Sequence, residues 1–156
     1  MQMKCLAVLI AWTSLRGQTL MILPAPPIAG RAGSSQIMIA FPAGAERAAA
    51  LQWRIAAPGG AIVSLTVSSA AEQAGKSLVC AQPKDDQGTT GNVYRCILSG
   101  GLQEIPDGPI AVVRYRAAEG KREVTLRIDE VLGATPNGEA IRFAEVRSTI
   151  EVNKER

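Results

Sequence analysis

The feature that most constrains the fold is a series of short segments in which apolar and polar residues alternate. Residues 50–56, ALQWRIA, put Leu51, Trp53 and Ile55 on one face and polar side chains on the other. A period of two is typical of a β-strand with one buried face. Turns rich in glycine and proline, such as PGG at residues 58–60, separate these segments. The chain is therefore expected to fold as β-strands joined by tight turns.

The pattern continues to the C-terminus, and only one helical turn is expected, at residues 69–75. The expected strands cover residues 36–41, 50–56, 62–67, 77–81, 93–98, 110–116, 123–129, 141–143 and 146–152. Many short strands at regular spacing predict an all-β fold, an antiparallel jelly-roll β-sandwich of about nine strands. A chain of 156 residues, 47% of them hydrophobic, can bury one full core, so residues 33–156 are expected to form one domain.

The formal net charge of +3 comes entirely from the N-terminal segment. Lys4, Arg16 and Arg31 are its basic residues, and residues 1–32 contain no acidic residue. Subtracting these three from the 17 basic residues leaves 14, which balance the 14 acidic residues of the remaining chain. A groove for nucleic acid needs a net basic domain with exposed aromatic side chains. No nucleic-acid partner is therefore expected.

The N-terminal segment has the pattern of a secretory signal. Lys4 precedes the run CLAVLIAW, which resembles the short apolar region of such a signal and ends at Thr13. A membrane span needs roughly 20 apolar residues, so no stable membrane span is expected after signal removal. We therefore expect an exported protein, located outside the cell or in the cell envelope.

A second apolar stretch, residues 20–28, contains three prolines and allows several interpretations. It is either the true apolar region of the signal, with cleavage near the small residues at 29–32, or a proline-rich linker. Alternatively, the N-terminal segment forms a strand and loop of the domain. Residues 1–32 are accordingly assigned as a candidate signal or N-terminal apolar segment.

The chain has three cysteines, and Cys5 lies inside the candidate signal. Cys80 and Cys96 then remain as an even pair on two expected strands. A disulfide between them would contribute roughly 3 kcal/mol of stability, and disulfides are typical of exported proteins. The alternative is two buried reduced thiols in a cytosolic protein. We predict the Cys80–Cys96 disulfide.

The sequence contains no histidine, which excludes Ser-His-Asp and Cys-His catalysis and histidine-bearing zinc sites. Glycine motifs that bind phosphate, and the nucleophile elbow of hydrolases, are also absent from the sequence. We therefore expect no enzyme activity, no catalytic residue, no cofactor and no metal site.

Two adjacent carboxylate pairs remain, and neither has the arrangement of a general acid–base pair. Asp129 and Glu130 are neighbours on an expected strand, so their side chains should point to opposite faces. Asp85 and Asp86 lie in a polar loop and are expected to form a solvated turn. Calcium binding by this loop is the alternative, because nearby threonine and asparagine side chains supply further oxygens.

Aromatic side chains are few outside the candidate signal: they are Phe41, Trp53, Tyr94, Tyr115 and Phe143. Trp53, Tyr94 and Tyr115 alternate in phase with apolar neighbours and are expected in the core. Binding of a flat polysaccharide surface relies on exposed aromatic platforms. Direct binding of such a surface therefore has little support.

Arginines are instead expected on outward positions of the strands: they are Arg54, Arg95, Arg114, Arg116 and Arg127. One interpretation is a solvated sheet face that resists edge pairing and aggregation. The other is an arginine-rich face that docks an acidic protein partner, because arginine is enriched at interfaces. These five arginines are the candidate binding residues.

Several segments resemble bacterial cohesin-like domains. Residues 48–55, AAALQWRI, are similar to the second-strand signature of that family, and residues 107–113, DGPIAVV, to a later strand. The sequences NGEAI and STIEV near the C-terminus look like its closing hairpin and last strand. Residues 74–80 and 94–100, which carry Cys80 and Cys96, resemble a two-cysteine subgroup from exported proteins.

This resemblance implies a nine-stranded jelly-roll sandwich related to some carbohydrate-binding modules, in a non-catalytic extracellular protein. The best-known members hold dockerin-bearing enzymes on polysaccharide-degrading scaffolds through one sheet face. We therefore expect an exported module that docks a dockerin-like protein partner or a polysaccharide. The alternative is a structural subunit of a cell-envelope or filament assembly, with the N-terminal apolar segment kept as a packing strand.

Overall fold

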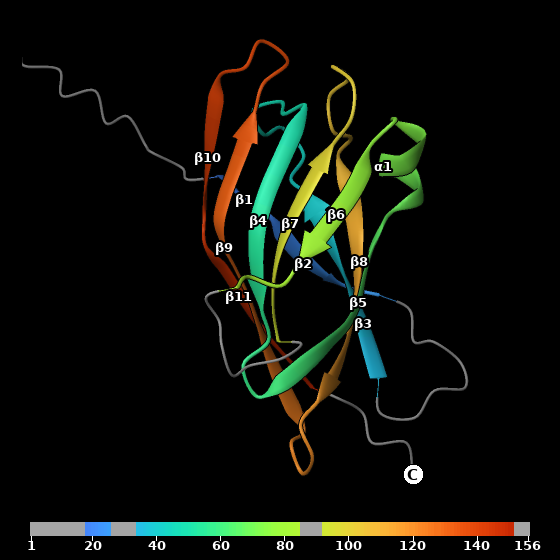
Figure 1. Cartoon of the computed structure of the whole chain (residues 1–156), viewed down its shortest axis with the longest axis vertical. Coiled ribbons are helices and arrows are strands. Elements are labelled where there is room, and N and C mark those ends of the chain that lie inside the picture. Colours follow the sequence, from blue (N-terminus) through green and yellow to red (C-terminus); the bar gives the residue numbers. More distant parts are fainter. Residues whose placement is uncertain (1–17, 26–33, 85–91, 152–156) are drawn as a thin grey trace, which may run out of the picture.

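Side chains alternate between core and solvent along the strands. These strands form two packed sheets (Figure 1). The computed structural model describes residues 18–25, 34–84 and 92–151. Its elements are β1 (Gln18–Thr19), β2 (Met21–Pro24), β3 (Ser34–Phe41), β4 (Ala50–Ala56), β5 (Gly60–Val67), α1 (Ser69–Gln73), β6 (Ser77–Ala81), β7 (Val93–Ser99), β8 (Gly108–Ala117), β9 (Glu123–Ala134), β10 (Ala140–Ala144) and β11 (Val146–Glu151). Within the described ranges, no helix has the length and apolar character needed to span a membrane.

The strands divide into a large and a small sheet. The large sheet has the order β1-β10-β9-β4-β7-β6, and β11 also pairs with β9. The small sheet has the order β2-β3-β8-β5. Neighbouring strands are antiparallel except for β1 and β10, which are parallel. The expected β-sandwich with one short helical turn is therefore confirmed, and the nine expected strands correspond to β3 through β11.

Apolar side chains from the inner faces of both sheets form the core. The largest of them are Trp53 at 2% exposure, Tyr115 at 0% and Phe41 at 1%. The rings of Phe41 and Phe143 meet edge to face, with 5.8 Å between their centroids. Trp53 and Tyr115 are thus core residues, as expected, because they share the inward phase of their strands.

The N-terminal part of the described chain belongs to the sandwich. Strand β1 pairs with β10 in the large sheet, and β2 pairs with β3 in the small sheet. Leu20 lies between the two strands with only 1% of its surface exposed. The chain therefore passes from one sheet to the other at Leu20.

Two buried or half-buried cations hold the segment between β7 and β8. Lys76 is 2% exposed, and its Nζ donates to the carbonyl oxygens of Ala49 at 2.8 Å, Gly100 at 2.7 Å and Gln103. Burial lowers the pKa of Lys76. Because two of these carbonyls lie in the loop after β7 and the third lies just before β4, this one ammonium group fastens that loop to the start of β4.

Arg47 holds the same loop from its outer side. Its guanidinium pairs with Glu104 at 3.2 Å and with Asp107, and it donates to the carbonyl oxygen of Ile105. The hydrogen bond to Asp107 raises the pKa of Arg47. Ile105 itself is fully buried, so the loop is fixed at both its polar and its apolar contacts.

We predict that Leu20→Ala lowers the free energy of unfolding by about 3 kcal/mol, because it opens a cavity where the two sheets meet. Met21→Ala is the matched control, since Met21 is 43% exposed and should change stability by less than about 1 kcal/mol. Urea unfolding of both variants measures the difference. Equal losses from the two substitutions would show that the N-terminal strands are not part of the cooperative core.

Candidate functional site

The outer face of the large sheet carries a row of side chains that crosses four strands. Val79 on β6 lies opposite Ile97 on β7, Ile97 lies opposite Gln52 on β4, and Gln52 lies opposite Leu132 on β9. We call these four residues the exposed row. Neighbouring strands are about 4.8 Å apart, so the row is about 14 Å long. Figure 1 shows the four strands side by side.

The exposed row is unusually apolar for a solvent-facing position. Val79 is 68% exposed, Ile97 51% and Leu132 37%. These three account for half of the large hydrophobic side chains that are exposed in the described chain; the others are Met21, Val63 and Leu102. Clustering of exposed apolar side chains marks interaction surfaces, whereas single ones need no explanation.

Charged side chains lie beside the exposed row on the same face. Arg95, Arg54 and Asp129 occupy directly opposed positions on β7, β4 and β9. Asp129 pairs with Arg54 at 3.3 Å and with Arg127 at 3.0 Å. Arg95 pairs with Glu130 at 3.0 Å. We call these five residues the charge cluster, and its three guanidinium groups exceed its two carboxylates by one positive charge.

A β-bulge in β9 gives the charge cluster its geometry. The register passes from Gln52 opposite Leu132 to Arg54 opposite Asp129, so Trp53 faces two residues of β9, Glu130 and Val131. Glu130 has a φ of 49°, the only positive φ among the described non-glycine residues. Asp129 and Glu130 both form ion pairs with arginines of the outer face. The expectation that they point to opposite faces was wrong, because the bulge interrupts the alternation.

A small recess lies between the exposed row and the charge cluster. Its volume is about 110 Å³, and it is lined by Gln52, Trp53, Arg95, Cys96, Ile97 and Glu130. The side chains of Arg95 and Glu130 beside it are 59% and 54% exposed. A single side chain that enters the recess can therefore contact an apolar wall, an amide group and an exposed ion pair.

The Cys80–Cys96 disulfide is present and lies beneath this face. The two cysteines are directly opposed on β6 and β7, with 4.1 Å between their Cα atoms. Cys96 is 1% exposed. Because Val79 and Ile97 form the adjacent register pair, the disulfide fastens the edge strand β6 next to the exposed row.

The five candidate arginines do not form one face. Arg54, Arg95 and Arg127 gather in the charge cluster, whereas Arg114 and Arg116 lie on β8 in the small sheet. Sequence phase alone separates inward from outward positions but does not assign a strand to a sheet. The exposed row was not predicted from the sequence. A local signal was present, because Val79 and Ile97 are apolar residues that stand next to the inward-facing Cys80 and Cys96.

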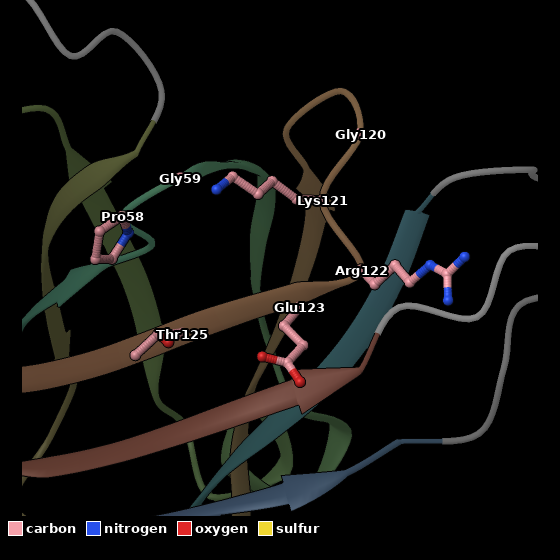
Figure 2. A pocket seen from close by; sticks show the side chains of 7 residues that line it. All are labelled: Pro58, Gly59, Gly120, Lys121, Arg122, Glu123 and Thr125. Carbon is pink, nitrogen blue, oxygen red and sulfur yellow. The ribbon is translucent and has the colours of Figure 1, made fainter.

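Other candidate sites have less support. Asp85 and Asp86 lie outside the described residues, and no group of three metal-ligating side chains occurs in the part that the structure describes. A hollow of about 350 Å³ lies between the turn at Gly59 and the β8–β9 hairpin. Figure 2 shows that Lys121 extends toward Gly59 while Arg122 points away. The charged side chains that line this hollow do not converge on one point.

We predict that the paired substitutions Cys80→Ala and Cys96→Ala lower the free energy of unfolding by about 3 kcal/mol, because they release the edge strand β6 from β7. Urea unfolding of the oxidised protein and of this variant measures the loss. Wild-type protein unfolded with a dithiol reductant is the control and should behave like the variant. An unchanged midpoint in both would contradict a structural disulfide.

No family model and no curated protein matches this sequence. Solved structures do match the fold. A non-cellulosomal cohesin from Archaeoglobus fulgidus has a TM-score of 0.64 at 12% identity, covering 88% of this chain and 92% of that one. A cohesin module from a Clostridium perfringens family 33 glycoside hydrolase has a TM-score of 0.63 at 10% identity, covering 89% and 98%.

A third similar structure is a cohesin bound to a dockerin from Clostridium thermocellum. Its TM-score is 0.62 at 10% identity, and the match covers 86% of this chain and 99% of that one. All three matches span most of both chains, so they concern the whole sandwich rather than a shared motif. The protein therefore has the fold of cohesin domains, and a disulfide joins its strands β6 and β7.

Proposed function

We propose that this protein is a non-catalytic docking module that binds a dockerin-like protein through the outer face of β6, β7, β4 and β9. The exposed row is the observation that carries the proposal. Its apolar side chains would lose contact with water in a complex, which is the main favourable contribution to association. The charge cluster beside it supplies a polar border of the kind found around such apolar centres.

Two similar solved structures support a dockerin as the class of partner. The Clostridium thermocellum cohesin was solved with a bound dockerin, and a cohesin from scaffoldin B of Acetivibrio cellulolyticus was solved with the Cel5 dockerin. The latter matches with a TM-score of 0.62 and covers 88% of this chain. The same proposal includes that the protein acts together with polysaccharide-degrading enzymes.

Protein docking is favoured over direct polysaccharide binding by the character of this face. None of the large hydrophobic side chains that are exposed in the described chain is aromatic. Stacking on sugar rings relies on aromatic faces, whereas aliphatic side chains flanked by ion pairs suit a protein surface. A glycan array bound by the wild-type protein, with no dockerin bound, would reverse this preference.

We predict that Ile97→Glu weakens dockerin binding about 30-fold or more, because it buries a charge at the centre of the interface. The test is a panel of immobilised dockerin modules, followed by titration with the module that binds. Val63→Glu is the matched control, since Val63 is also aliphatic and 45% exposed but lies on β5 of the small sheet. Equal effects of the two substitutions would contradict docking through the large sheet.

Export to the cell surface or the extracellular space is part of the proposal. A structural disulfide supports it, because disulfides persist in oxidising compartments. Cleavage near residues 29–32 would remove β1 and β2 together with the buried Leu20. Cleavage before Gln18 would retain all the described strands, so we expect processing there.

The mass of the protein purified from its native location tests this prediction. A mature N-terminus after the apolar run that ends at Thr13, and no later than Gln18, is the expected result, because both described N-terminal strands are then retained. A mature N-terminus after residue 28 would contradict it. A mass that includes residue 1 would favour the second candidate function, a subunit of an envelope or filament assembly, for which the packed strands β1 and β2 are the supporting observation.

A further inference from the structure

We propose that the recess beside Glu130 receives an acidic side chain of the docked protein, whose carboxylate replaces Glu130 as the partner of Arg95. The inference rests on the proposed docking function and names the chemistry of one contact within it.

Glu130 occupies a backbone conformation that its side chain disfavours. Its φ of 49° lies in the left-handed region, where a Cβ atom approaches the backbone closely and which glycine or asparagine adopts more easily. Such conformations persist only where the surrounding structure enforces them, and they cluster at binding sites. Here the bulge directs the Glu130 carboxylate across β4 toward Arg95 on β7.

The recess has room for one short side chain. Its volume of about 110 Å³ corresponds to about three or four water molecules at their liquid volume. Ile97 provides an apolar wall, Gln52 an amide group, and Arg95 with Glu130 an ion pair. Side chains that contribute most to protein association fill recesses of this kind at the centre of an interface.

The charge balance selects a carboxylate as the occupant. Asp129 is shared by Arg54 and Arg127, with distances of 3.3 Å and 3.0 Å. Within the described chain, Glu130 is the carboxylate that pairs with Arg95. Arg54 is also directly opposed to Arg95 on the neighbouring strand, and two like charges at such positions repel each other. A partner's carboxylate would therefore be attracted, and a basic side chain repelled by three arginines.

The Arg95–Glu130 pair is suited to exchange. Both side chains are more than half exposed, at 59% and 54%, so water screens their attraction and little is lost when they separate. A carboxylate enclosed under the docked protein would be shielded from water and would bind Arg95 more strongly. Glu130 thus pairs with Arg95 in the free protein, and the partner's carboxylate takes its place in the complex.

The test compares two substitutions of similar size whose expected effects have opposite signs. Glu130→Gln removes the competing carboxylate, so affinity for the dockerin module selected above should rise severalfold. Arg95→Gln removes the anchor, so affinity should fall about tenfold or more and depend less steeply on salt concentration. A fall in affinity with both variants would favour a basic occupant and overturn the proposal. No change with either would show that the recess is outside the interface.

A second measurement needs no partner. Glu130→Gly relieves the strained backbone, so its melting temperature should equal or exceed that of the wild type. Thr125→Gly is the control, because Thr125 also faces outward on β9 but with an ordinary extended backbone, and it should melt lower. A loss with Glu130→Gly equal to the control's would show that Glu130 is held for stability alone.

The outcomes separate this inference from the proposed function. If no dockerin module binds the wild type, the docking function fails, while the melting temperatures still report whether Glu130 is strained. If Ile97→Glu abolishes binding but Arg95→Gln and Glu130→Gln leave it unchanged, the docking face stands and the acidic contact is wrong.

Discussion

Burial of the inner face of β4 is the constraint on which the remaining structure depends. Leu51, Trp53 and Ile55 are between 0% and 2% exposed and fill the centre of the sandwich. Because side chains alternate along a strand, their burial forces Gln52 and Arg54 to the outer face. β4 lies between β7 and β9, so its register also sets which residues of those strands stand beside Gln52 and Arg54. Burial of the inner side chains of β4 therefore determines which side chains form the candidate docking face on the opposite side of the sheet.

Much of this could be predicted from the sequence, since a period of two is a local property. Nine strands and the inward aromatic residues follow from that period and from glycine–proline turns, and the helical turn follows from the local start and stop signals at residues 69–75. Strands β1 and β2 did not emerge as firmly, because the prolines between residues 20 and 28 interrupt any alternation. Their pairing is determined by β10 and β3, more than ten residues further along the chain.

The candidate site was harder to predict, because it depends on long-range pairing. The division of five arginines between two sheets follows from topology, which sequence phase does not contain. The bulge at Glu130 has no local signal either, since a glycine or asparagine would be expected at a positive φ. Residues that break a local conformational rule often lie at functional positions, and at such residues prediction from the sequence is expected to fail.

The arrangement of bonds across the molecule separates rigid support from an adaptable surface. Lys76 is buried and hydrogen-bonds to the start of β4 and to the loop after β7, and the disulfide joins β6 to β7 covalently. The Arg95–Glu130 pair on the outer face is more than half exposed and therefore weak in water. A partner can rearrange that pair without disturbing the strands beneath it. Strong buried contacts fix the position of the face, and weak exposed contacts leave its charges free to be exchanged.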